Sequence, residues 1–330
     1  MTTWLNVGLV VVGMLVLYWG AEWLIRGSAG LARGFGVKPL VIGLTVVAYG
    51  TSAPELAVAT DTALTNNTGI ALGTVIGSCA ANISLILGIT ALIRPPSIDG
   101  RLIRREAPVL LGSAIAVPLL FRNGVLSRLE GGLLIACAVL FTIVTLTVSA
   151  RQEPADDTPQ LPEAQDADQS GAAIGGRAHP RTSAAVAAIM TAFGLLLLVL
   201  GSNLFVRGGR QIAAELGMSE RMLGLTVIAL GTAMPELIGS IVAASRGHSD
   251  LAIGSVIGSN LLNVFLVLGV TAFLRPIHLG EPMHVVDLVG LVAITLLGVL
   301  MLRGSRRISR FEGVLLIAAY VTFIVACAVW

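Results

Sequence analysis

The chain has 330 residues, of which 55% are hydrophobic and only 12% are charged, and its formal net charge is +2 at pH 7. A soluble domain carries roughly 25% charged residues, so the composition excludes an ordinary soluble protein and indicates an integral protein of the lipid bilayer. The small net charge gives no reason to expect nucleic-acid binding.

Apolar runs of about 20 residues, the length that spans a bilayer as a helix, follow one another along the chain. The first run has no basic segment before it, so we expect a membrane helix rather than a signal peptide. The predicted fold class is an all-α polytopic membrane protein. Its ten transmembrane helices are expected roughly at 4–26, 37–65, 69–93, 103–121, 127–150, 182–206, 220–246, 250–274, 283–302 and 308–329.

A hydrophilic segment separates the fifth and sixth expected helices. Residues 151–181 are acidic, contain several Pro and Gly residues and have almost no large apolar side chain. This predicts a flexible linker between residues 1–150 and 182–330. If successive loops alternate sides, 15 Lys and Arg residues fall on the side of the linker and 6 on the other side. The positive-inside rule then predicts a multi-pass cell-membrane protein with a cytoplasmic linker and both termini outside.

The two halves of the chain are copies of each other. Residues 43–56 return at 224–237 with 10 of 14 positions identical, and residues 73–95 match 254–276 with 13 of 23 identical. Chance similarity between apolar segments would share Leu and Val, but not Pro, Glu, Asn and Arg at a fixed offset. Because each half has five expected helices, an odd number, the second half enters the membrane in the opposite orientation. We therefore predict two inverted-topology five-helix repeats, with motifs at 43–95 and 224–276 and a site near the midplane between them.

A proline interrupts each copy of the first motif. Pro54 and Pro235 lack a backbone N–H, so the carbonyls of Gly50 and Gly231, one turn earlier, lose their helical partner. In hydrocarbon such a carbonyl costs several kcal/mol unless another group satisfies it. We expect a bound cation to do so.

A glutamate follows each proline. A bare carboxylate at the bilayer centre costs roughly 3 kcal/mol, and no Lys or Arg lies in the core of these helices to neutralise Glu55 or Glu236. Their natural partner is a cation. Thr51 and Thr232 lie four residues before the two glutamates and therefore share their helix faces.

Serine and asparagine side chains recur in the second motif. Ser78 and Asn82 are four residues apart, as are Ser259 and Asn263, so each pair shares one helix face. Interhelical hydrogen bonding could explain these residues singly, but not their combination with repeated prolines and glutamates. All predicted ligands are oxygens, which suit hard cations such as Ca²⁺ or Na⁺ and argue against Zn²⁺ or Cu.

The string Gly-Thr-Ser-Ala-Pro-Glu at 50–55, with Gly-Ser-x-x-x-Asn at 77–82 and the second copies of both, resembles the α-repeats of the sodium/calcium exchanger family, within the cation/Ca²⁺ antiporter superfamily. The likeness covers all ten expected helices and is to the prokaryotic type, without large calcium-sensing domains. It implies four central ion sites in which Glu55 and Glu236 are shared ligands for Ca²⁺ and Na⁺. It also implies that expected helices 1 and 6 slide across the core to switch access. The further ligands that it implies are backbone carbonyls of Ala48 and Ala229, carbonyls and hydroxyls of Thr51 and Thr232, and side chains of Ser78, Asn82 and Ser259.

Two positions depart from the family pattern. Ala233 stands where Ser is common and opposite Ser52, which removes one peripheral ligand from the second half. Asn263 stands where several members have Asp, so the site has only two carboxylates; this favours independence of K⁺. We include Ser52 and Asn263 among the predicted metal ligands.

These residues predict a secondary antiporter that exchanges Na⁺ for Ca²⁺. One Ca²⁺ or two protons would each neutralise two carboxylates, so Ca²⁺/H⁺ exchange stays open, and a passive cation channel is a further alternative. No motif such as His-Glu-x-x-His occurs, so we expect no enzyme activity, no cofactor beyond the transported ions and no obligatory protein partner.

Other polar residues are expected to be structural. We expect Glu22 at the membrane interface rather than in a vestibule, and Glu106 and Asp287 near helix N-termini. Three cysteines, Cys79, Cys137 and Cys327, lie far apart in apolar runs, so neither a metal site nor a disulfide framework is predicted.

Overall fold

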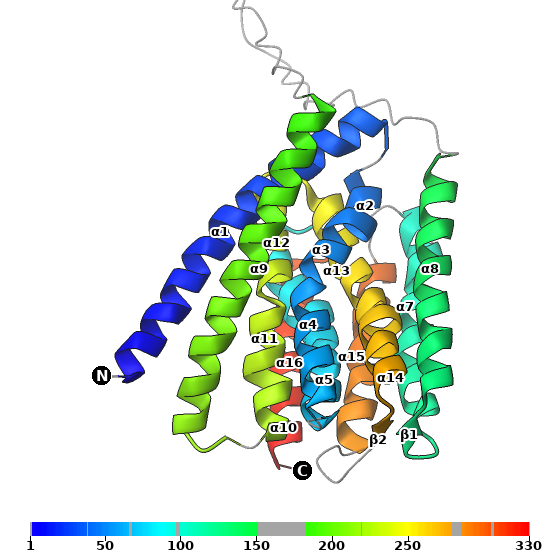
Figure 1. Cartoon of the computed structure of the whole chain (residues 1–330). Helices are drawn as coiled ribbons and strands as arrows, with labels where there is room; N and C mark the ends of the chain where they lie inside the picture. Colours follow the sequence, from blue (N-terminus) through cyan, green and yellow to red (C-terminus); the bar gives the residue numbers. More distant parts are fainter. Residues whose placement is uncertain are drawn as a thin grey trace, which may run out of the picture.

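The structure is a computed structural model that describes residues 2–37, 39–65, 68–96, 100–150, 183–218, 220–278, 285–304 and 307–329. The linker expected at 151–181 lies outside these ranges. The described chain is helical apart from turns and one short antiparallel pair of strands, β1 (Val125–Leu126) and β2 (Ile277–His278). The all-α membrane fold is therefore confirmed (Figure 1).

The first half contains the helices α1 (Thr2–Phe35), α2 (Pro39–Ile42), η1 (Gly43–Val47), α3 (Ala48–Thr51), α4 (Ala53–Leu64), α5 (Thr68–Ala80), η2 (Ala81–Ile86), α6 (Leu87–Ile93), α7 (Gly100–Leu120) and α8 (Arg128–Ala150). The second half contains α9 (Ala184–Glu215), α10 (Glu220–Leu223), η3 (Gly224–Ile228), α11 (Ala229–Thr232), α12 (Met234–Ser245), α13 (Ser249–Leu262), η4 (Asn263–Val267), α14 (Leu268–Leu274), α15 (Val285–Gly304) and α16 (Arg310–Val329). The segments η1 to η4 are π-helical.

The number of membrane spans differs from the expected ten. Among the described residues, eight helical segments are long and apolar enough to cross a membrane, and Gly224–Thr232 with Met234–Ser245, bent by 48°, makes a ninth. The helix α7 occupies the place of the remaining span but is not among them. Its first two turns contain three arginines and Glu106, which lower its hydropathy. The count of ten is thus not confirmed.

The first helix of each half is longer than predicted. Expected helix 1 was placed at 4–26, but α1 continues to Phe35, and α9 continues to Glu215 rather than ending near 206. At about 1.5 Å per residue a helix of 34 residues is about 51 Å long, which exceeds a hydrocarbon core of about 30 Å. Both helices are accordingly inclined to the rest of the bundle in Figure 1.

The two halves have opposite orientations. The helices α1 and α9 pack along their length with their numbering running in opposite directions. A Cβ on Gly13 would lie 2.8 Å from the carbonyl oxygen of Gly201, and a Cβ on Gly194 would lie 2.8 Å from that of Gly20. The first helices of the two repeats are therefore antiparallel, as an inverted repeat requires.

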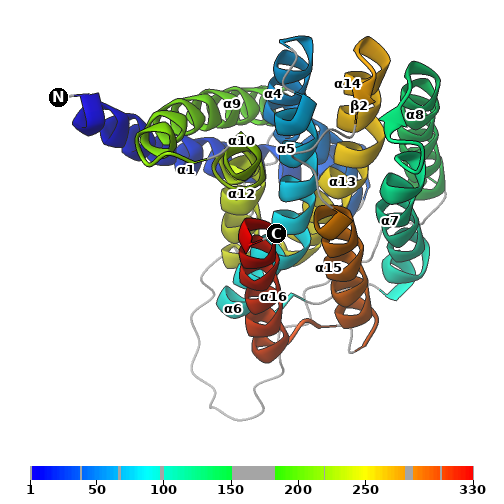
Figure 2. The ribbon, with the colours of Figure 1, turned by 90° about the horizontal axis from the view of Figure 1, so that it is seen from below.

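The most buried helices are the third of each half. Within the span Ser249–Leu274, 94% of an apolar stretch of 18 residues is buried inside the protein, and the corresponding share is 78% for Gly69–Ile93 and 28% for Arg128–Thr147, Ala184–Glu215 and Arg310–Cys327. Figure 2 shows α5 and α13 near the middle, with α7, α8, α15 and α16 around them and the α1–α9 pair projecting to one side. The outer helices expose many large apolar side chains, which suit contact with lipid.

Glu22, expected at the membrane interface, is buried and paired within the protein. Only 5% of it is exposed, and its Oε1 accepts hydrogen bonds from Arg26 on α1, at 2.6 Å, and from Arg246 just after α12. The two arginines satisfy the carboxylate that would otherwise be costly to bury. Glu22 thus forms an ion pair between α1 and the end of α12.

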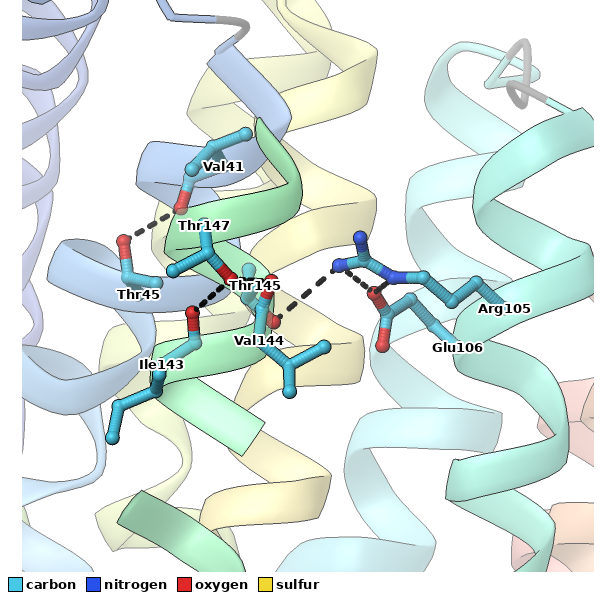
Figure 3. Close-up of polar contacts among 8 residues, drawn as sticks. All are labelled: Val41, Thr45, Arg105, Glu106, Ile143, Val144, Thr145 and Thr147. Carbon is cyan, nitrogen blue, oxygen red and sulfur yellow. Dashed lines mark hydrogen bonds and ion pairs between the residues drawn. The ribbon is translucent and has the colours of Figure 1, made fainter. Parts of the chain in front are cut away.

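Glu106 lies on α7 in a mainly structural setting. The side chain is 1% exposed, and Arg105 donates to it from Nε at 2.6 Å (Figure 3). Arg105 Nη2 also lies 3.4 Å from Thr145 Oγ1 on α8. The Glu106 carboxylate is therefore paired with Arg105 on the same helix, and Arg105 also links α7 to α8. Asp287 is fully buried and also interacts with another group of the chain.

Candidate cation site

The second helix of each half breaks at the repeated proline motif. The break follows Thr51 at Ser52 (φ −79°, ψ 1°) and follows Thr232 at Ala233 (φ −80°, ψ 1°). Proline is tolerated in the first turn of a helix, because a backbone N–H at that position would have no intrahelical acceptor. Pro54 and Pro235 accordingly sit in the first turns of α4 and α12.

The carbonyls freed by the prolines are not left for a cation, contrary to our expectation. The oxygen of Gly50 accepts a backbone N–H at the end of α3, because the turn tightens at the break. The oxygen of Gly231 accepts the hydroxyl of Ser202, on α9, at 2.9 Å. Ser202 was not predicted; its repeat counterpart is Ala21, so the sequence pattern contained no repeated signal for it.

Hydroxyl groups from the two halves meet at the breaks. Thr51 Oγ1 lies 3.3 Å from Ser259 Oγ, and Thr232 Oγ1 lies 3.4 Å from Ser78 Oγ. These two contacts are related by the repeat offset and join the broken helix of one half to the third helix of the other. Four of the five predicted hydroxyl residues are thereby brought together in pairs, and these four are fully buried.

The carbonyls of the two predicted alanines lie beside these hydroxyls. Ala229 O accepts from Ser78 and from Thr232, each at 3.2 Å, and Ala48 O accepts from Thr51 at 3.4 Å. Each alanine directly follows a π-helical segment, η1 or η3. Such π-helical turns are rare and are often found at functional sites. No pattern in the sequence predicted them.

The two glutamates belong to the same part of the protein, and three of their four carboxylate oxygens have no hydrogen-bond partner among the described residues. Glu55 and Glu236 are both 0% exposed and lie close enough for their charges to repel each other. Neither oxygen of Glu55 has a hydrogen-bond partner among the described residues, and neither does Glu236 Oε2. No basic side chain is paired with either glutamate in the described part of the chain. A buried carboxylate without hydrogen bonds is unstable unless a cation or a proton joins it.

The two asparagines are equally short of partners. Both side-chain polar atoms of Asn82 and of Asn263 are buried and have none among the described residues. Seven of the eleven buried side-chain N and O atoms of this kind belong to these asparagines and the two glutamates. Because unpaired buried polar groups are rare, their concentration here indicates a place for a ligand.

The two halves of the site are not equivalent. Ser52 Oγ donates a long hydrogen bond of 3.5 Å to Glu236 Oε1, whereas its repeat counterpart Ala233 has no hydroxyl to offer Glu55. Ser240 adds a further difference, because its buried hydroxyl lies four residues after Glu236, has no partner among the described residues and matches Ala59 in the first half. Ser240 was not predicted, since it does not repeat.

Small residues allow the helices to approach closely around the site. A Cβ added to Gly77 on α5 would lie 2.6 Å from Leu225 O and from Ala229 Cβ. A Cβ on Gly258 of α13 would lie 2.9 Å from Leu44 O and 2.7 Å from Ala48 Cβ. The third helix of each half thus packs directly against the π-helical segment of the other half, which places the serines beside the broken helices.

The donor set suits a hard cation. It consists of carboxylate, hydroxyl, amide and carbonyl oxygens, the ligands that Ca²⁺ and Na⁺ accept. Among the described residues, no group of three or more His, Cys, Asp and Glu side chains gathers at one place, so soft-metal coordination has no support there.

We expect Ser202→Ala to lower the thermal stability of the protein. The variant removes the hydroxyl that donates to Gly231 O, and the helix cannot replace it because Pro235, one turn later, has no N–H. An unsatisfied buried acceptor costs roughly 1–3 kcal/mol. Melting of the purified protein in detergent measures the effect. Thr322→Ala is the matched control, because the exposed Thr322 hydroxyl donates only to its own helix. Equal melting temperatures for the two variants would contradict a role for Ser202.

Comparison with known proteins agrees with this geometry. A family model described as sodium/calcium exchanger protein matches residues 5–147 and 186–329. The chain is 36% identical over 317 residues to the putative antiporter CaxA of Alkalimonas amylolytica, covering 95% of this chain and 96% of that protein. It is 28% identical over 343 residues to the sodium/calcium exchanger MaX1 of Methanosarcina acetivorans, covering 97% of each.

A solved structure shows the same likeness. The sodium-calcium exchanger NCX_Mj, soaked with 2.5 mM Na⁺ and 0.1 mM Ca²⁺, matches with a TM-score of 0.78 and 30% identity, covering 97% of this chain and 98% of that one. Inverted helical repeats around a buried, oxygen-lined carboxylate pair define a multi-pass membrane antiporter of the cation/Ca²⁺ class. This chain belongs to the sodium/calcium exchanger family.

Proposed function

We propose that this protein exchanges Na⁺ for Ca²⁺ across the membrane by alternating access to the site between Glu55 and Glu236. The observation that carries the proposal is the concentration of unpartnered buried oxygens at these two glutamates and the neighbouring asparagines. Ions bind there as transported substrates, and we propose no catalytic reaction. Thr51, Thr232, Ser78 and Ser259, with the carbonyls of Ala48 and Ala229, supply further oxygens; Ser52 and Asn263 are the remaining proposed ligands.

The charge of the site favours exchange over uniport. Two carboxylates without a counter-ion in a water-poor interior are strongly destabilised, so the empty site should change access slowly. One Ca²⁺ makes the pair neutral, and Na⁺ ions neutralise it as well. Binding of either Ca²⁺ or Na⁺ therefore lowers the free-energy cost of switching the site from one side of the membrane to the other. This couples the Ca²⁺ flux to the Na⁺ flux.

Na⁺ is the counter-ion that the relatives favour. MaX1 and NCX_Mj are both named sodium/calcium exchangers, and they match nearly the whole chain. Proton exchange is the second candidate, because two protons would also neutralise two adjacent buried carboxylates.

Flux of ⁴⁵Ca²⁺ into proteoliposomes decides between the two. We expect an outward Na⁺ gradient to drive Ca²⁺ uptake when the pH is clamped on both sides. Uptake that follows a pH gradient and ignores Na⁺ would replace Na⁺ by H⁺ in the proposal. Ca²⁺ flux without any counter-ion would contradict exchange and indicate a channel.

The orientation is part of the proposal. Figure 1 shows both chain ends toward one end of the bundle, and the ends of α8 and α9 that flank residues 151–182 toward the other. We place the second, arginine-rich end in the cytoplasm, in line with the positive-inside rule.

We further propose that α1 and α9 move together against the core. These two helices pack closely on each other and project from the bundle (Figure 2), whereas the site lies among the other helices. The ion pair between Glu22 of α1 and Arg246 beside α12 joins the pair to the core. It therefore stabilises one position of α1 relative to α12.

We expect Glu22→Gln to shift the balance between the two access states. Losing the charge weakens the link between α1 and Arg246, so the ratio of apparent Ca²⁺ affinities at the two faces should change several-fold. Measuring Ca²⁺ dependence in oriented proteoliposomes tests this.

Glu215→Gln is the matched control. Glu215 accepts a hydrogen bond from Thr3 at 3.1 Å and so joins α9 to α1, but not to the core. We expect Glu215→Gln to leave the affinity ratio unchanged. If Glu22→Gln also leaves it unchanged, the Glu22 ion pair does not set the position of α1.

A further inference from the structure

A polar cavity lies at the arginine-rich end of the protein, outside the cation site. Its volume is about 480 Å³, and it lies where the turn between α12 and α13 meets the start of α2 and the end of α6. The polar lining consists of Arg94, His248, Ser249, Asp250 and Arg307, with Gly247 at the turn. None of these residues takes part in the proposed transport site.

The turn between α12 and α13 accommodates an arginine side chain. Gly247 has a φ of +86°, which other residues rarely adopt, and a Cβ there would lie 3.3 Å from Arg94 Nη1. The glycine therefore lets the guanidinium lie against the backbone. Among the described residues, no ion pair or hydrogen bond is made by the Arg94 side chain; its backbone N–H donates to Thr90 O.

The other charged groups leave the cavity positive. Arg307 and Arg94 supply two positive charges, and Asp250 supplies one negative charge; Asp250 and Arg307 each also interact with another group of the chain. Burial lowers the pKa of His248, which lies between two membrane-spanning helices, and the charge of Arg33 lowers it further. The lowered pKa favours the neutral imidazole, which offers a hydrogen bond without adding charge.

The start of α13 contributes to the same cavity. His248 is the N-terminal cap of this 14-residue helix but makes no side-chain capping bond, and Ser249 and Asp250 of the first turn line the cavity. A helix N-terminus carries partial positive charge and favours an anion. It adds to the field of the two arginines.

Among the described residues, the equivalent positions at the opposite end do not repeat this arrangement. Arg275 is the repeat counterpart of Arg94, but it donates to Leu64 O at 3.4 Å. Thr65 and Val125 stand in the first half where the second half has Arg246 and Arg307. Since these arginines of the second half are not repeated in the first, the repeat itself does not account for the cavity.

We propose that this cavity binds a phosphate group. A guanidinium recognises phosphate oxygens through paired N–H donors, and the cavity combines two arginines with a hydroxyl, an imidazole and a helix N-terminus. The phosphate comes either from a lipid head group at this face or from a soluble anion. The proposal is independent of the transported ions.

Phosphate-dependent stabilisation of the full chain tests the proposal. Melting is measured in detergent with inorganic phosphate against chloride at equal ionic strength, and in nanodiscs of phosphatidylglycerol against phosphatidylcholine. We expect at least one of the two phosphate sources to raise the melting temperature. We expect Arg94→Gln to weaken the responsible interaction about tenfold or more, and Arg94→Lys to weaken it less.

Arg275→Gln is the matched control at the opposite end. It should respond to phosphate as the unmodified protein does. Dependence on Arg94 in detergent assigns the site to a soluble phosphate, and dependence only in nanodiscs assigns it to the lipid. No stabilisation by either source, or equal loss in Arg94→Gln and Arg275→Gln, would overturn the proposal.

Discussion

Replacement of either Glu55 or Glu236 by Gln is expected to reduce Ca²⁺ exchange to less than about 1% of the unmodified rate. Each glutamate is fully buried and has no basic partner among the described residues, so the pair supplies the negative charge that the cation meets. A hundredfold loss corresponds to about 2.8 kcal/mol, a modest part of what a buried unpaired charge costs. Initial rates of ⁴⁵Ca²⁺ uptake in proteoliposomes measure the loss.

The same variants should fold normally. Gln has nearly the shape of Glu and removes a buried charge, so we expect melting in the absence of Ca²⁺ to occur at the same temperature or higher. Asp61→Asn is the control, because Asp61 is an exposed acid on the same helix, α4, and should transport at the unmodified rate. Undiminished exchange in Glu55→Gln or Glu236→Gln would remove that residue from the site.

Replacement of Gly77 by Val is expected to destabilise the protein and stop exchange. The new Cβ would lie 2.6 Å from the backbone oxygen of Leu225, which cannot rotate away. Overpacking of this kind costs roughly 1–3 kcal/mol or more, and here it also forces α5 away from η3. Ser78 would then lose its contacts with Thr232 and Ala229 O.

Gly112→Val is the matched control for this prediction. Gly112 lies on the exposed face of α7 in the same type of helix, and a Cβ there would meet nothing within 4 Å. Melting temperature and Ca²⁺ flux should stay near their unmodified values. If Gly77→Val melts and transports like Gly112→Val, the close helix approach is not needed for the site.

Much of the fold could be predicted because the two halves of the sequence can be aligned with each other. The recurrence of Pro, Glu, Ser and Asn at one offset indicated two copies, and the odd number of helices per copy indicated their inversion. The antiparallel packing of α1 on α9 agrees with that prediction. The structure also brings Thr51 beside Ser259 and Thr232 beside Ser78, as converging repeat motifs require.

The features that do not repeat could not be predicted in this way. Ser202, which satisfies Gly231 O, and Ser240, one turn after Glu236, have alanine counterparts, so the repeat gave no signal for either. The pairing of Glu22 with Arg246 could not be predicted because the two residues are 224 positions apart and become adjacent only when α1 packs on α12. The π-helical segments depend on backbone register, for which no residue type is diagnostic.

The role of the broken helices is also changed by the structure. Neighbouring backbone and hydroxyl groups satisfy the carbonyls of Gly50 and Gly231, so these carbonyls do not demand a cation. The buried groups that lack a partner and would be stabilised by a cation are instead the carboxylates and the asparagine amides. Proline at the start of α4 and α12 serves mainly to end one helical segment and begin the next beside the glutamates.

The most direct test of this account is the position of Ca²⁺ in a crystal of the protein soaked in saturating Ca²⁺ without Na⁺. We predict one ion between the carboxylates of Glu55 and Glu236, with oxygen ligands at roughly 2.3–2.6 Å, and its displacement when Na⁺ replaces Ca²⁺. Ordered Ca²⁺ elsewhere in the protein, with none between these two carboxylates, would contradict it.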